Sequence, residues 1–230
     1  MNHPQRHYQI FDQHGVALLD GLLESRGGVE DYRQAMLRLG NYLGGVLLSR
    51  LDASKCYGIM ATAEDVDFLV KGLVEAIKPK VAGLSFACYW NKRLHYVAEG
   101  LNAAPIVKSF CEPDFFDVDD LIVVKAVISS ACVVRTNITD VIRSLTPGRI
   151  HIVAPVIFQN ADRGLCGEFP DDISDKFVFT YLASDSERDS AGNLVPGVGG
   201  EIYGLLGLGN QDDKNHYVPE LVMEKLSALP

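Results

Sequence analysis

Basic side chains gather in the middle of the chain, in a segment whose charge suits the binding of phosphate groups. Residues 125–163 carry five basic side chains against two acidic ones, although the 230-residue chain has a net charge of −9. Such a segment suits a phosphorylated small molecule better than a nucleic-acid duplex, which needs many phosphate contacts at once. The alternative is a set of solvated surface charges. The five side chains belong to Lys125, Arg135, Arg143, Arg149 and Arg163.

A short run of small residues, Ser129 to Cys132, lies between an apolar stretch and a helical pattern. A loop that opens a helix offers free N–H groups and the positive end of the helix dipole to a phosphate. The alternative is an ordinary loop in which such residues cap the helix. The candidate phosphate-binding residues are Lys125, Ser129, Ser130, Ala131, Cys132 and Arg135.

The cysteines and histidines form no recognisable metal or nucleophile pattern. The five cysteines include no CxxC pair and the six histidines no HExxH motif, so no metal site is predicted. In a cytosolic chain such cysteines are expected to be buried small hydrophobes. A nucleophilic Cys132 would need a lowered pKa and a placed base, and the sequence supplies no such base. Catalytic residues are therefore left unassigned.

Two amphipathic helices are predicted in the first third of the chain. Apolar residues recur every three or four positions over residues 29–47, where Gly44 and Gly45 weaken the helix or mark close packing. A second helix is expected to begin after Thr62, which stands three residues before Asp65 as in a capping box. Pro79 ends this second helix.

Short apolar runs then alternate with helical patterns, which predicts an α/β fold. The expected sheet is central and mostly parallel, with helices on both faces, N-terminal helices and a small C-terminal hood. Ligands of such sheets bind beyond the carboxyl ends of the strands. Strands are predicted at residues 81–86, 105–110, 121–124, 150–158 and 177–182, and helices at residues 91–103 and 138–145.

The segment from Leu121 to Ile142, LIVVKAVISSACVVRTNITDVI, resembles the phosphoribosyl-diphosphate-binding motif of type I phosphoribosyltransferases. In that motif an apolar strand ends in an acidic residue, and a Thr-Gly-Gly-Thr loop opens the next helix. The segment GNLVPGVGG at residues 192–200 resembles the base-recognition loop of uracil phosphoribosyltransferases, and the Arg163-Gly164-Leu165 turn also fits that family. The resemblance covers about residues 80–207.

This resemblance implies a single phosphoribosyltransferase-like domain over residues 1–230, with an N-terminal helical part (1–79), a core sheet (80–183) and a hood (184–230). It also implies transfer of a phosphoribosyl group to a nucleobase, with phosphoribosyl diphosphate as the donor and Mg²⁺ as the cofactor. A homodimer is implied as well. Backbone groups of a glycine loop can approach a base edge closely. The implied base-binding residues are Val195, Pro196, Gly197, Val198, Gly199 and Glu201.

The chain departs from the family pattern at the donor site. Val124 and Lys125 stand where the family places an acidic residue, and Ser129 to Cys132 replace the glycine loop. Two interpretations follow. The chain is an enzyme for a different phosphorylated donor, whose phosphates Lys125 and Arg135 neutralise. Alternatively, it is an inactive homologue that acts as a nucleotide sensor or as a regulatory module docking to a protein partner.

The remaining sequence features bear on location and partners. No stretch approaches the roughly 20 apolar residues of a membrane span. The first 15 residues also lack the apolar block of a secretory signal. We therefore expect a cytoplasmic protein whose partners are a nucleotide or phosphoribosyl compound and other protein chains, with no membrane and no nucleic acid.

Overall fold

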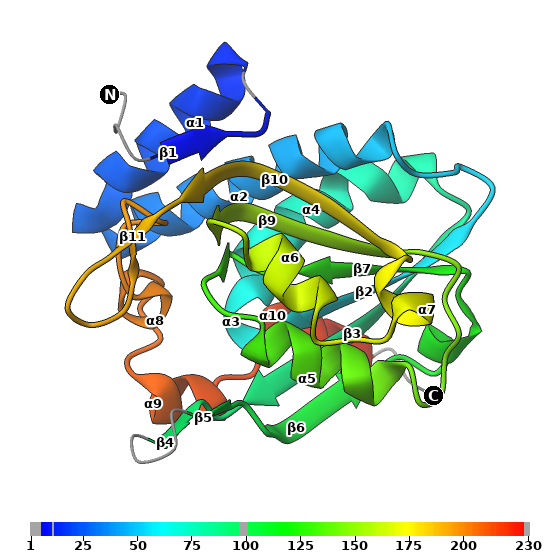
Figure 1. Ribbon diagram of the computed structural model, residues 1–230. Coiled ribbons are helices and arrows are strands. Elements are labelled where there is room, and N and C mark those ends of the chain that lie inside the picture. The colour runs from blue at the N-terminus through cyan, green and yellow to red at the C-terminus, as the bar shows by residue number, and fades with distance from the viewer. Residues whose placement is uncertain (1–5, 11, 97–100, 228–230) are drawn as a thin grey trace.

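A central sheet organises the molecule (Figure 1). The computed structural model describes residues 6–10, 12–96 and 101–227. Within these ranges the sheet has eight strands. They are β1 (Arg6–Tyr8), β2 (Cys56–Thr62), β3 (Gly83–Asn91), β6 (Ile106–Cys111), β7 (Asp120–Val124), β8 (Val127–Ile128), β9 (Ile150–Phe158) and β10 (Phe177–Asp185).

The sheet is mostly parallel, as the alternation of strands and helices predicted. The strand order is β1-β10-β9-β7-β2-β3-β6, and β8 pairs with β9. The five central strands from β10 to β3 run parallel, whereas β1 and β6 pair antiparallel at the two edges. Counted along the chain, the parallel strands lie in the order 2-1-3-4-5, which reverses between β2 and β7. In open α/β sheets such a reversal marks the crevice where ligands bind.

Helices cover both faces of this sheet, which confirms the predicted α/β class (Figure 1). One apolar core joins α1 (Gln13–Glu24), α2 (Val29–Leu48) and α4 (Lys71–Ile77) to the sheet. A second core on the opposite face includes residues of α5 (Cys132–Val141) and α6 (Ala161–Cys166). The short helix α7 (Asp171–Ser174) follows α6 and leads into β10.

The contact between α2 and α4 explains the glycines of α2. A Cβ atom on Gly44 would lie 2.7 Å from Ala76 Cβ and 2.8 Å from the Leu73 carbonyl oxygen. A Cβ on Gly40 would lie 2.0 Å from the Leu69 carbonyl oxygen, whereas one on Gly45 would meet nothing within 4 Å. Gly40 and Gly44 therefore mark close packing, and Gly45 is exposed.

Two local predictions are wrong. Residues 91–103 were predicted as a helix, but β4 (Leu94–Tyr96) and β5 (Leu101–Ala103) pair antiparallel there, with residues 97–100 outside the described part. The spacing from Leu94 to Leu101 fits a helix as well as two strands, and pairing decides between them. Thr62 forms no capping box, because its hydroxyl donates to Asp65 Oδ2 at 2.7 Å and caps no backbone N–H.

The C-terminal segment folds over one end of the sheet. A hairpin of β11 (Glu187–Arg188) and β12 (Leu194–Val195) precedes α8 (Ile202–Leu205), α9 (Gln211–His216) and α10 (Glu220–Ser227). The short α3 (Ala63–Asp65) begins directly after β2. Among the described residues, no helix combines the length and the apolar character needed to cross a bilayer.

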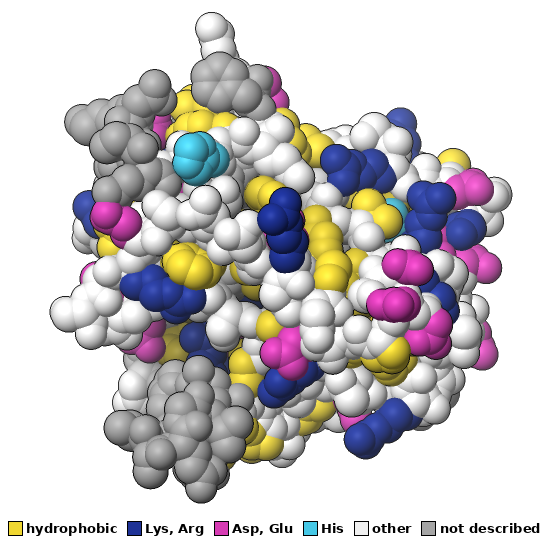
Figure 2. All heavy atoms as spheres, viewed as in Figure 1, with side chains coloured by type: hydrophobic (Ala, Val, Ile, Leu, Met, Phe, Trp, Pro, Cys, Tyr) yellow, Lys and Arg dark blue, Asp and Glu magenta, His cyan; other side chains and the backbone are white. Residues whose placement is uncertain are grey.

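The face that carries α5 to α7 has mixed charge. Lysine and arginine side chains lie among aspartate and glutamate side chains there, and no continuous basic stripe crosses this view (Figure 2).

Candidate functional site

A cavity of about 250 Å³ brings together the two segments that the sequence singled out. On one side lies the loop before α5, and on the other lie the β11–β12 hairpin and α8. The described residues that line it are Arg93, Leu94, Ala103, Val127, Ser129, Ser130, Cys132, Val133, Arg188, Ala191, Gly192, Asn193, Leu194, Val198, Gly200, Glu201, Ile202 and Tyr203.

The start of α5 presents backbone N–H groups beside this cavity. The helix begins at Cys132, its N-cap residue is Ala131, and no side chain caps it. The Arg135 N–H donates to the Ala131 carbonyl at 2.7 Å, so the helical hydrogen bonds begin only one turn later. Uncapped first-turn N–H groups and the helix dipole favour an anion at this place.

Arg188 fixes one wall of the cavity. Its guanidinium donates to the carbonyl oxygens of Ser129 and Gly192, which joins the hairpin tip to the loop before α5. The guanidinium carbon also lies 4.3 Å from the ring centroid of Phe158, the last residue of β9. A cation held in this way adds positive charge beside the start of α5.

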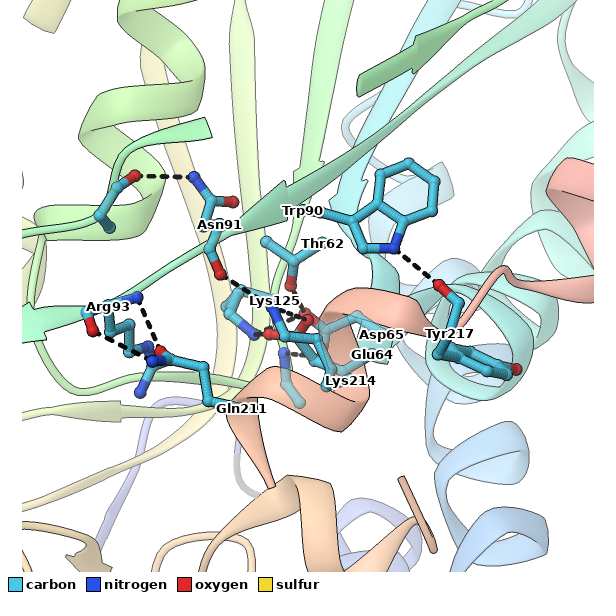
Figure 3. Close-up of polar contacts among 12 residues, drawn as sticks. Thr62, Glu64, Asp65, Trp90, Asn91, Arg93, Lys125, Gln211, Lys214 and Tyr217 are labelled. Atoms are coloured by element: carbon cyan, nitrogen blue, oxygen red, sulfur yellow. Dashed lines mark hydrogen bonds and ion pairs between the residues drawn. The ribbon is translucent and has the colours of Figure 1, made fainter. Parts of the chain in front are cut away.

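Arg93, just after the end of β3 (Gly83–Asn91), supplies a second guanidinium to the cavity lining. Gln211 holds its backbone, since the Arg93 N–H donates to Oε1 at 2.7 Å and the Arg93 carbonyl accepts from Nε2 at 3.1 Å (Figure 3). These two bonds attach the chain after β3 to α9. The side chain of Arg93 is left to line the cavity.

Lys125 lies outside this cavity, in a buried cluster of charges (Figure 3). Its ammonium nitrogen is 2.6 Å from Asp65 Oδ2 and 3.1 Å from Glu64 Oε1, and the Lys125 side chain is only 4% exposed. Lys214 from α9 completes the cluster, with its nitrogen 3.6 Å from Glu64 Oε2 and 2.9 Å from the Asn91 carbonyl oxygen.

Burial and neighbouring charges shift the pKa values of this cluster in both directions. Burial alone would raise the pKa of Glu64, but the ammonium groups of Lys125 and Lys214 outweigh it and lower that pKa to about 2. Burial would lower the pKa of Lys125, and Asp65 and Glu64 raise it above its usual range instead. Burial dominates at the other two members, since it raises the pKa of Asp65 and lowers that of Lys214. The cluster thus pairs two buried amino groups with two buried carboxyl groups.

The glycine-rich loop places only part of its predicted surface in the cavity. Val198 and Glu201 line the cavity, and Val195, Pro196, Gly197 and Gly199 do not. Several of its backbone groups already have partners. The Gly197 carbonyl accepts from Arg6 at 2.6 Å, and the Val198 carbonyl accepts from Tyr32 at 2.9 Å. A base would therefore meet mainly side chains here.

The other predicted phosphate ligands are divided between two places. Ser129, Ser130 and Cys132 line the cavity, and Ala131 is the N-cap residue of α5 beside it. Arg135 lies outside, where its guanidinium forms an ion pair with Glu168 at 2.7 Å.

Arg93, Arg188 and Tyr203 line the cavity but were not predicted from the sequence. Arg93 fell in a segment predicted as helix, and Arg188 in a polar connection. A signal for Arg188 was available, because residues 164–230 hold four basic side chains among twelve acidic ones. Tyr203 is 4% exposed, and the Lys214 nitrogen lies 5.5 Å from its ring centroid.

Solved structures are similar to this fold, although no protein-family model and no curated protein matches the sequence. The AQ2163 protein of Aquifex aeolicus is 13% identical, with a TM-score of 0.65 over 86% of this chain and 95% of that one. This match shows a shared fold.

Phosphoribosyltransferases also overlap, less completely. The L. donovani hypoxanthine-guanine enzyme is 8% identical, with a TM-score of 0.42 over 68% of this chain and 84% of that one. The adenine enzyme of Trypanosoma brucei, in complex with AMP, pyrophosphate and ribose-5-phosphate, is 10% identical, with a TM-score of 0.42 over 64% of each chain. Overlaps at this level carry no functional weight.

Proposed function

We propose that this chain is a phosphoribosyltransferase-like protein that binds a phosphorylated ribose compound in the cavity between α5 and the β11–β12 hairpin. One observation carries the proposal: two guanidinium groups and an uncapped helix start border one cavity. Arg188 lies beside the loop before α5, and Arg93 approaches from the end of β3. Arginine recognises phosphate through paired N–H donors, and a helix start adds backbone donors.

The size and lining of the cavity support a small nucleotide or sugar phosphate. The cavity volume of about 250 Å³ lies just below the roughly 300 Å³ at which ligand pockets begin, so the cavity suits only a small ligand. Apolar side chains of Val127, Leu194 and Val198 offer a surface for a base or the ribose ring. Uracil is the base we propose, because the loop at residues 192–200 resembles the base loop of uracil enzymes.

Transfer of the phosphoribosyl group to uracil is a second candidate, and Glu201 favours it. Glu201 is the carboxylate among the described residues that line the cavity. A carboxylate near the ribose would stabilise the positive charge that develops as pyrophosphate leaves. Binding without turnover would instead fit a nucleotide sensor. Cytoplasmic location, a homodimer and a protein partner stay predictions of the sequence.

Isothermal titration with phosphoribosyl diphosphate, ribose 5-phosphate and uridine monophosphate tests the proposed binding. We expect micromolar binding of at least one of them, and no binding of uridine, which lacks a phosphate. Absence of binding by all three phosphates would contradict the proposal.

Release of pyrophosphate from phosphoribosyl diphosphate in the presence of uracil tests the second candidate. Glu201→Gln keeps the size of the side chain and removes its charge. We expect this variant to retain binding and to lose turnover if transfer occurs. Binding without pyrophosphate release in the unmodified protein would leave the sensor as the function.

A further inference from the structure

The crevice where the strand order reverses is filled by the chain's own charged side chains. It lies between the carboxyl ends of β2 and β7, where Glu64 and Asp65 follow β2 and Lys125 follows β7. In the resembled family an acidic residue at the end of the β7-equivalent strand binds the ribose directly or through Mg²⁺. Here an ammonium group occupies that position in the sequence.

Three of the four oxygen atoms of the two carboxylates already accept hydrogen bonds. Asp65 Oδ1 accepts from the Ala126 N–H at 3.1 Å, and Asp65 Oδ2 accepts from Lys125 and from the Thr62 hydroxyl. Glu64 Oε1 accepts from Lys125 at 3.1 Å. Glu64 Oε2 accepts no hydrogen bond from the described residues, and the Lys214 ammonium nitrogen lies 3.6 Å from it. Both carboxylates are almost fully buried. A divalent cation would have to displace an ammonium group to reach them.

The charge balance of the cluster also opposes a metal ion. Two ammonium groups offset two carboxylates, so no net negative charge remains to attract Mg²⁺, which prefers carboxylate and phosphate oxygens. Within the described ranges, no group of three or more His, Cys, Asp or Glu side chains is arranged to hold a metal. The residues present therefore do not fit the Mg²⁺ that the sequence resemblance implies.

Two arginines, rather than a metal ion, supply positive charge to the cavity. Arg93 follows β3, and Arg188 stacks on the last residue of β9. Because β7 and β2 separate these strands, their carboxyl ends lie three strand spacings apart, roughly 14 Å. The two guanidinium groups thus approach the cavity from opposite sides, as suits a ligand with phosphates at two ends.

We propose that the cavity binds its phosphorylated ligand without a divalent metal ion. Arg93 and Arg188 neutralise the phosphates. Lys125 forms ion pairs with the carboxylates that would otherwise hold a metal. This inference rests on the proposed function, because it concerns the same cavity. It predicts that metal-free and metal-containing buffers give the same affinity.

Titration of the full chain with phosphoribosyl diphosphate, in EDTA and in Mg²⁺, tests the inference. We expect the two dissociation constants to agree within about threefold. Binding that is tenfold or more tighter in Mg²⁺, about 1.4 kcal/mol, would overturn the inference and leave the proposed function intact. Absence of binding in both buffers, for ribose 5-phosphate and uridine monophosphate as well, contradicts the proposed function instead.

Mn²⁺ alone gives a readout that needs no phosphate ligand. Electron paramagnetic resonance of Mn²⁺ with the unmodified protein is expected to show the free ion only. A bound signal that Asp65→Asn abolishes would overturn the inference, because it would place the metal at the occupied carboxylates. This measurement tests the buried carboxylates as a metal site even if no phosphate compound binds.

Arginine variants test whether Arg93 and Arg188 neutralise the phosphates of the ligand. We expect Arg93→Ala and Arg188→Ala each to weaken phosphoribosyl diphosphate binding at least about tenfold in EDTA, with no recovery in Mg²⁺. Arg143→Ala is the matched control, since Arg143 is exposed beyond the last residue of α5 and does not line the cavity. Affinity restored by Mg²⁺ in either cavity variant, or unchanged affinity in both, would overturn the inference.

Discussion

Arg6 and Asp185 form a buried two-pronged ion pair that connects β1 to the loop beside the cavity. Arg6 Nε lies 2.8 Å from Asp185 Oδ1, Arg6 Nη2 lies 2.7 Å from Asp185 Oδ2, and both side chains are fully buried. Asp185 Oδ2 also accepts from the Gly197 N–H at 2.8 Å. The pair therefore determines where the loop that follows β12 lies.

Asp185→Asn should destabilise the protein strongly. The change keeps the shape of the side chain but leaves the Arg6 guanidinium buried without its counter-charge. Loss of one partner of a buried pair costs about 3–5 kcal/mol. Urea unfolding would measure this loss. The double variant Arg6→Met with Asp185→Leu should recover much of it, and a single variant as stable as the unmodified protein would contradict the role of the pair.

Arg188→Ala should weaken ligand binding while leaving the fold intact. The variant removes a guanidinium from the cavity wall, and a hydrogen bond to a charged group contributes about 1.5–3 kcal/mol, or roughly 10- to 150-fold in affinity. The Arg143→Ala variant, which removes an exposed arginine outside the cavity, should bind as the unmodified protein does. Calorimetry measures both. Equal losses in the two variants would place the ligand elsewhere.

Alkylation of Cys132 should report occupancy of the cavity. Its half-buried thiol lines the cavity, whereas the thiol of Cys166 does not. Burial raises the pKa of both thiols, so iodoacetamide should be used at mildly alkaline pH. Ligand at ten times its dissociation constant should slow modification of Cys132 about tenfold. Peptide mass spectrometry should show no change at Cys166.

Gly44→Ala and Gly45→Ala should have opposite effects although the residues are neighbours in α2. A methyl group at Gly44 would press on α4, which costs about 1–3 kcal/mol in a packed contact. A methyl group at Gly45 meets nothing within 4 Å and should stabilise the helix by up to about 1 kcal/mol. Denaturant unfolding of both variants measures the difference, and effects of the same sign would contradict this packing.

His151 should make the protein sensitive to acid. Its ring is buried beside Tyr57, and burial lowers the pKa of His151 to about 4 from an ordinary value near 6.5. Between these values the unfolded chain takes up a proton that the folded chain excludes. Stability therefore falls as the pH drops from about 6.5 to 4, by roughly 3 kcal/mol in total.

His151→Phe keeps an aromatic ring beside Tyr57 and removes the titrating group. Unfolding free energies of the variant should change less over this pH range than those of the unmodified protein. The slopes should differ by up to about 1.4 kcal/mol per pH unit within the range. Parallel slopes for the two proteins would contradict a buried neutral His151.

The amino-acid sequence alone determined the fold class and several of its elements, but not β2 or the β4–β5 hairpin. Apolar runs such as residues 150–158 predict strands buried on both faces, and their alternation with helices predicts the mostly parallel sheet that is observed. The small residues from Ser129 to Cys132 likewise indicate a loop that opens a helix. These are properties of adjacent residues, so a linear pattern records them.

Tertiary structure decided which charges meet. The positive charge of Lys125 suggested a phosphate-binding residue from the sequence. The pairing of β7 with β2 instead places Lys125 against Glu64 and Asp65, about 60 residues earlier in the chain. Arg93 and Arg188 become cavity residues only because the chain after β3 and the hairpin after β10 meet at one end of the sheet. Ion pairs depend on distance in space, and strand order sets that distance.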